Sequence, residues 1–185
     1  MLLCKKTQGV FMNTAYKNMR NFWLDVTNLK NRKGVIEIGA DKISIAGVEM
    51  AAESEGVLRH LFVATNSLGD TSLYFENNSK SGVGGIIGGH GHEKLEDAAA
   101  HMLAYAGKLT DKMHSGKELP SPSATGKVCL FAVSKEKIFY IELEEQEARN
   151  PENPFYPFFA YSQQTLSAFK EQEENSSPDG KSARA

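Results

Sequence analysis

The chain has 185 residues, of which 41% are hydrophobic and 24% are charged, a composition typical of one soluble globular domain with a packed core. Its formal net charge is −2, from 21 basic and 23 acidic residues, which argues against a dedicated nucleic-acid-binding protein. Two cysteines exclude a disulfide-rich secreted scaffold. We expect a cytoplasmic protein, because no stretch has the length and hydropathy of a secretory signal or a membrane span.

Charge is distributed unequally along the chain. Residues 1–33 contain seven basic residues and one acidic residue, a formal charge of +6, and the remaining residues carry −8. Part of this negative charge comes from four glutamates within residues 142–147. The pattern indicates either two solvated faces of opposite sign or a partner contact, such as a homodimer, that uses both ends.

The first predicted element is an amphipathic helix that begins near Met12 and ends at residues 31–34. Asn13 or Thr14 is expected to cap it. Residues 1–11 precede the periodic pattern and are expected to form a flexible leader. Apolar residues recur in the helix at steps of three and four, the spacing of one helix face: Met12, Ala15, Tyr16, Met19, Phe22, Trp23, Val26 and Leu29.

Four strands are predicted after this helix. Short β-branched runs at 35–38 and 43–45 flank a hairpin turn at 39–42, and residues 50–55 fit a loop or a single helical turn. Two longer strands are predicted at 58–65 and 71–76, with a turn at 66–70 between them.

A loop at 77–91, rich in glycine and serine, is predicted to lead into a second helix that starts near His92 and ends at Gly116. Residues 173–185 have the polar composition of a disordered tail, so that a single domain spans 12–172. Between Gly116 and this tail we expect a loop at 117–126, a hairpin whose strands are 127–133 and 137–143, and a third helix at 162–172.

The predicted order is α-β-β-β-β-α-β-β-α, which indicates an α+β fold with an antiparallel sheet of about six strands and three helices. This order resembles two fold families, the secretion-chaperone-like fold and the profilin or roadblock-like group. The resemblance covers the order of the elements and no sequence motif. It implies a domain that binds protein partners.

The segment from Gly82 to Glu93 is the first candidate ligand site. Glycines let backbone N–H groups converge on an anion, and a helix N-terminus adds donors and partial positive charge. The segment lacks the Gly-Lys-Ser/Thr ending of a phosphate-binding Walker loop, and Glu93 would repel an anion. A plain connection between strand and helix is the alternative. The ligand-binding candidates are Gly85, Gly88, Gly89, His90, His92 and Glu93.

The same segment offers metal ligands. His90 and His92 form an H-x-H pair, and Asp97 and His101 lie one turn apart on the following helix. These four side chains could surround a zinc ion with an open coordination position. The alternative is a solvated helix face with an imidazole near its cap, and no other cofactor is predicted.

The sequence contains no nucleophile motif, and this absence argues against an enzyme. His60 is interpreted as a partly buried structural histidine, because it has no evident partner in the sequence. Cys129 lies in the apolar run Val-Cys-Leu-Phe and is interpreted as a buried core thiol.

An aromatic run near the C-terminal end has two interpretations: it closes the hydrophobic core, or it forms a partner or self-association surface, because aromatic residues are enriched at interface centres. Its members are Phe155, Tyr156, Phe158, Phe159 and Tyr161. With no catalytic motif, the sequence favours a non-catalytic protein-binding or adaptor module that self-associates. The alternative is a small metal- or anion-binding protein or enzyme that uses residues 82–93.

Overall fold

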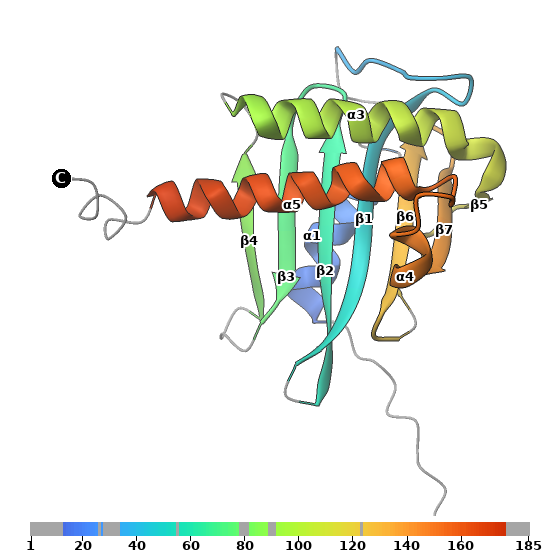
Figure 1. The fold of residues 1–185 in the computed structure, drawn as a ribbon. Helices are drawn as coiled ribbons and strands as arrows, with labels where there is room; N and C mark the ends of the chain where they lie inside the picture. The colour runs from blue at the N-terminus through green and yellow to red at the C-terminus, as the bar shows by residue number, and fades with distance from the viewer. Residues whose placement is uncertain are drawn as a thin grey trace, which may run out of the picture.

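The computed structural model describes residues 13–25, 27, 34–54, 56–77, 82–88, 92–122 and 124–176. They form one sheet with helices on both faces (Figure 1). The strands are β1 (Ile43–Ser54), β2 (Val57–Asn66), β3 (Thr71–Glu76), β4 (Val83–Gly88), β5 (His114–Gly116), β6 (Lys127–Ser134) and β7 (Ile138–Glu144). The helices are α1 (Thr14–Leu24), α3 (Glu93–Leu109), the 3-10 turn η1 (Thr110–Lys112), α4 (Glu145–Ala148) and α5 (Tyr156–Ser176).

The described strands form a seven-stranded sheet in the order β4-β3-β2-β1-β6-β7-β5. Every neighbouring pair is antiparallel. The predicted α+β class with an antiparallel sheet is therefore confirmed. The strand set differs in detail: β4 and β5 were not predicted, and the predicted strand 35–38 contributes only an isolated bridge between Ile38 and Ile43.

Strand β1 continues through residues 50–54, where the sequence predicted a loop or a helical turn. Its register with β2 is continuous as far as Ser54 opposite Val57. Pairing along the whole of β2 outweighs the weak strand propensity of the alanines and glutamates in this stretch.

Strand β4 lies within the glycine-rich segment that was predicted to be a loop at 77–91. Each of its six residues pairs with a residue of β3. Glycine suits the close approach, because a Cβ atom added to Gly85 would lie 2.6 Å from the carbonyl oxygen of Leu73. Pairing with β3 thus outweighs the low strand propensity of glycine.

Helix α1 begins as predicted and ends earlier. Asn13 is its N-cap, and the side-chain Oδ1 accepts a hydrogen bond from the N–H of Ala15 at 2.8 Å. The helix ends at Leu24, where the backbone of Asp25 becomes extended. The predicted helical positions 26 and 28–33 lie outside the described residues.

The other two long helices also differ from their predicted bounds. Helix α3 ends at Leu109 instead of Gly116, because η1 and β5 follow it. Helix α5 begins at Tyr156 and reaches Ser176, so that it is longer than the predicted 162–172. The predicted leader lies outside the described residues. Within the described ranges, no helix has the length and hydropathy needed to cross a membrane.

Helices α3 and α5 cover one face of the sheet, and α1 lies on the other (Figure 1). Each face has its own apolar core. Side chains that pack between the sheet and the helices α3 and α5 include Val48, Met102, Leu130, Phe158, Phe159 and Phe169. Those on the α1 face include Tyr16, Trp23, Ile45, Phe62, Cys129 and Phe131.

Candidate functional site on the α1 face

Glu49 is the centre of a buried polar network beneath α1. The Tyr16 hydroxyl donates to its Oε1 at 2.9 Å, and the Arg20 Nε donates to its Oε2 at 2.9 Å. Tyr16 and Arg20 are four residues apart and so share one helix face. Both carboxylate oxygens are therefore held by consecutive turns of α1.

Burial determines the electrostatics of this network. Burial raises the pKa of Glu49, and the nearby Arg20 guanidinium opposes that rise. Burial also raises the pKa of Tyr16 well above its ordinary value, and the Glu49 charge adds to the rise. The hydroxyl of Tyr16 is therefore a neutral donor to the carboxylate over the physiological range.

A second buried pair fixes the start of α1. His60 donates from its backbone N–H to Glu76 Oε2 at 2.9 Å, and its Nδ1 lies 2.9 Å from the same oxygen. Glu76 Oε1 accepts from the N–H of Asn13 at 2.6 Å. His60 is 2% exposed, more deeply buried than the partial burial that was predicted, and its partner lies on the neighbouring strand. Its Nε2 is buried and has no hydrogen-bond partner among the described residues.

The carboxylates of Glu49 and Glu76 fix the position of α1 and are inaccessible to a substrate. Glu49 is fully buried, the Glu76 side chain is 8% exposed, and the oxygens of both carboxylates are engaged. A general base must come within hydrogen-bonding reach of the proton that it removes. The network therefore pins α1 to the sheet, and the accessible features of this face are the grooves beside the helix.

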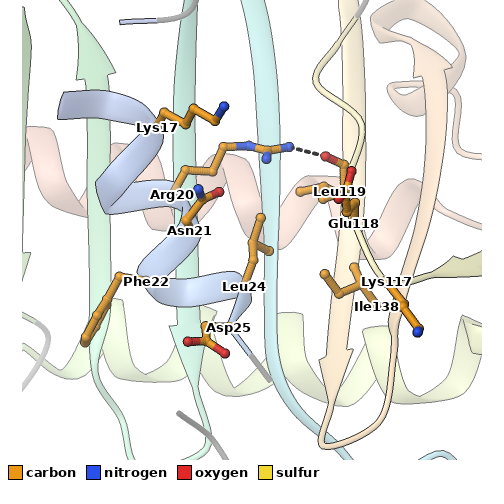
Figure 2. Close-up of a pocket in the computed structure, with 10 residues that line it drawn as sticks. All are labelled: Lys17, Arg20, Asn21, Phe22, Leu24, Asp25, Lys117, Glu118, Leu119 and Ile138. Atoms are coloured by element: carbon orange, nitrogen blue, oxygen red, sulfur yellow. Dashed lines mark hydrogen bonds between the residues drawn. The ribbon is translucent and has the colours of Figure 1, made fainter. Parts of the chain in front are cut away.

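A polar groove of about 640 Å³ lies between α1 and the segment 117–119 (Figure 2). Arg20 extends from α1 toward this segment, and its Nη2 donates to the carbonyl oxygen of Leu119 at 2.7 Å. Basic and acidic side chains both line the groove: Lys17, Arg20 and Lys117 with Asp25 and Glu118. The mixture of signs favours no single class of charged ligand.

An apolar groove of about 630 Å³ lies on the other side of α1, beside β3 and β4. It is lined by Met19, Phe22, Trp23, Leu68, Asp70, Thr71, Ser72, Tyr74, Ile87 and Gly88. Ile87 is 72% exposed and Phe22 is 52% exposed. Side chains of this size are mostly buried in a folded chain, so this groove is the main candidate for contact with another molecule.

A further groove of about 440 Å³ adjoins the apolar groove at the β2–β3 turn. It lies between this turn, the segment 36–38 and helix α3, and it is lined in part by Ile36, Leu68 and Leu103. Leu68 borders both grooves. Four large hydrophobic residues that line these two grooves are exposed, and we call them the apolar end of the molecule: Phe22, Ile36, Leu68 and Ile87.

The predicted anion- and metal-ligand residues are spread over two elements. Gly85 and Gly88 lie within β4, while His92 and Glu93 are exposed at the start of α3. Gly89 and His90 lie outside the described residues. Asp97 and His101 are exposed and in contact, with His101 Nδ1 3.3 Å from Asp97 Oδ1. No group of three or more His, Cys, Asp or Glu side chains in the described part of the chain is arranged to hold a metal ion.

The predicted aromatic run lies mainly inside the molecule. Phe155, Phe158 and Phe159 are each at most 4% exposed and belong to the core beneath α3 and α5. Tyr156 and Tyr161 are half-buried, and Tyr161 stacks on His101 with ring centroids 4.6 Å apart. The three phenylalanines thus close the core, the first of the two interpretations, and do not offer a surface to a partner.

The spacing of apolar residues predicted Phe22 and Trp23 on the same apolar face of the first helix, and the structure separates them. Trp23 is buried and Phe22 is exposed. Cys129 is buried as predicted, and burial raises the pKa of its thiol.

No model of a known protein family matches this chain, and a search of curated proteins finds no significant relative. The function must therefore be argued from the chain's own surface.

Proposed function

We propose that this protein is a non-catalytic protein-binding module whose partner surface is the apolar end. The observation that carries the proposal is the clustering of exposed side chains. Six large hydrophobic residues of the described chain are exposed, and the four of the apolar end line two adjoining grooves. Contiguous exposed apolar surface of this kind marks interaction sites.

The shape of the surface favours a polypeptide over a small molecule. Small-molecule sites enclose most of the ligand, whereas Phe22 and Ile87, which both line the apolar groove, are themselves mostly exposed. A partner that covers both side chains must extend over α1 and β4. Apolar side chains of a peptide segment would fill the groove between them.

The chemistry of the α1 face supports a binding role. Its buried carboxylates accept hydrogen bonds from Asn13, Tyr16 and Arg20, which belong to α1 and its N-cap. A helix that is held in this way presents Phe22 and Met19 in a constant position. A preformed surface lowers the entropy cost of association.

Selection from a random peptide library displayed on phage tests this proposal. We expect wild-type protein to enrich peptides with apolar residues, and Leu68→Lys to weaken the binding of the enriched peptides by roughly tenfold or more. Fluorescence polarisation with labelled peptides measures the change. Leu68 is the informative position because it borders both grooves.

Val57→Lys is the matched control. Val57 is also an exposed aliphatic residue, 53% exposed, but it lies at the opposite end of β2 from Leu68. It should bind the peptides like the wild type. Failure to enrich any peptide, or equal binding by the Leu68→Lys variant, would contradict the proposal.

A further inference from the structure

We propose that the sheet carries a second binding surface beside α5, which docks an amphipathic α-helix of a partner protein with acidic residues along the borders of its apolar face. This inference goes beyond the proposed function, because it adds a second partner on the face of the sheet opposite α1. A chain with both surfaces joins two partners. The inference depends on the position, the size and the charge of this surface.

The remaining exposed hydrophobic residues of the described chain lie together on this face. Outside the apolar end they are Val57 and Phe75. Leu61 packs against the core beneath α3 and α5, and both residues share its face: Phe75 lies opposite Leu61, and Val57 lies four positions before it on the same strand. Met50 lies opposite Leu61 on β1. We call Met50, Val57, Leu61 and Phe75 the open strip.

The open strip has the width of one helix beside α5. Below α5 in Figure 1, no described helix lies in front of the lower ends of β1 to β4. Gln163 of α5 marks the border, because its Nε2 donates to Met50 Sδ at 3.5 Å. Strand β1 continues four residues beyond Met50, to Ser54, which is about 13 Å of strand. A helix with its side chains is about 10–12 Å across, so one helix fits there against α5.

Hydrogen bonding favours a helix over an extended peptide. Strands β1, β2 and β3 each have a neighbour on both sides in the sheet, so they offer no edge to a peptide that lies on this face. A helix satisfies its own backbone groups. Four strands about 4.8 Å apart span about 14 Å, which is the length of roughly ten helical residues.

The charge beside the open strip has one sign. Among the described residues of β1 to β4 on this face, Arg59 alone is charged, and it lies between Val57 and Leu61. On α5, the exposed Lys170 follows Gln163 by seven residues, or two turns, and so points to the same side of the helix. Both side chains are positive at neutral pH. Acidic residues along the borders of the partner's apolar face complement them.

Fluorescence polarisation with two designed helical peptides tests the inference. Both have about 14 residues, which is longer than the strip, and the same leucine face, which is bordered by glutamates in one and by lysines in the other. We expect the glutamate peptide to bind the full chain roughly tenfold more tightly than the lysine peptide. Val57→Asp should weaken its binding by roughly tenfold or more, and Lys170→Glu should narrow the preference by roughly threefold. Circular dichroism should show that both variants keep the fold, since Val57 and Lys170 are exposed.

Leu68→Lys is the matched control, because Leu68 belongs to the apolar end and lies at the other end of the hairpin strand from Val57. It should bind the glutamate peptide like the wild type. Failure of the glutamate peptide to bind, equal binding of the two peptides, or equal binding by Val57→Asp overturns the inference. A dimer in sedimentation velocity that Val57→Asp dissociates also overturns it, because a second copy then covers the strip. Peptides selected on phage that bind in a Leu68-dependent manner leave the proposed function standing in each case, so the two failures are distinguishable.

Discussion

Arg20 and Glu49 form a buried ion pair between α1 and the middle of β1, with Arg20 Nε 2.9 Å from Glu49 Oε2. Arg20 is 7% exposed and Glu49 is fully buried. Taking two charges out of water is costly, and the attraction repays the cost only when the remaining donors and acceptors are satisfied. Tyr16 and the Leu119 carbonyl supply these partners, so the network acts as a unit that positions α1.

Removing one member of this network should lower the free energy of unfolding more than removing all of its charges together. Glu49→Leu leaves the Arg20 guanidinium and the Tyr16 hydroxyl buried without their acceptor, and we expect a loss of about 3–5 kcal/mol in the free energy of unfolding. The triple variant Tyr16→Phe, Arg20→Met, Glu49→Leu leaves only the Leu119 carbonyl oxygen without its donor and should regain much of this loss. Urea unfolding, followed by the fluorescence of the single tryptophan, Trp23, measures both.

Glu171→Leu is a useful comparison, because it breaks an exposed ion pair with Lys94. Exposed pairs contribute little to stability, so this variant should unfold much like the wild type. If the triple variant were as unstable as Glu49→Leu alone, the interpretation of the network as mutually satisfied charges would be wrong.

Tyr16→Phe should reveal the raised pKa of the Tyr16 hydroxyl. At neutral pH the variant should lose about 1.5–3 kcal/mol, because Glu49 loses a donor to its charged oxygen. The folded pKa of Tyr16 lies above the unfolded value, so the stability it contributes is fully present below about pH 10 and is lost as the pH rises toward the folded value. The difference between wild type and variant should therefore narrow above pH 10.

Urea unfolding of both proteins from neutral to alkaline pH measures this difference. The comparison cancels the titration of the other tyrosines, which both proteins share. A gap that stays constant or widens above pH 10 would show that Tyr16 is not held neutral by the fold.

Part of the α1 face could have been predicted from the sequence. The predicted turn at 66–70 is centred on residue 68, and a hairpin with that centre sets His60 beside Glu76; the observed pairs, such as Leu61 opposite Phe75, follow the same register. The partner of His60 was therefore implicit in the hairpin.

The remainder depends on packing between distant segments. Nothing local indicates that Glu49 meets Tyr16 and Arg20, because the contact requires α1 to lie across β1, and residues 29 or more positions apart form it. The strand β4 was missed for a related reason. Its glycines have a low intrinsic preference for strands, and only pairing with β3 makes the segment extended.

Gly85→Ala tests whether the glycine-rich segment is a paired strand in solution. An added Cβ would lie 2.6 Å from the Leu73 carbonyl oxygen and 2.8 Å from the Tyr74 ring. Because a backbone atom of β3 cannot move aside without disturbing the sheet, we expect a loss of about 1–3 kcal/mol in the free energy of unfolding, the range for overpacked sites.

Gly116→Ala is the matched control at the opposite edge of the sheet, since the nearest atoms to its Cβ are 3.7 Å away, and it should change stability little. Urea unfolding of both variants decides between two structures of this segment. Equal stability of the two variants would mean that residues 83–88 are not held against β3, and the glycine-rich segment would then be a loop able to bind an anion instead of a strand of the sheet.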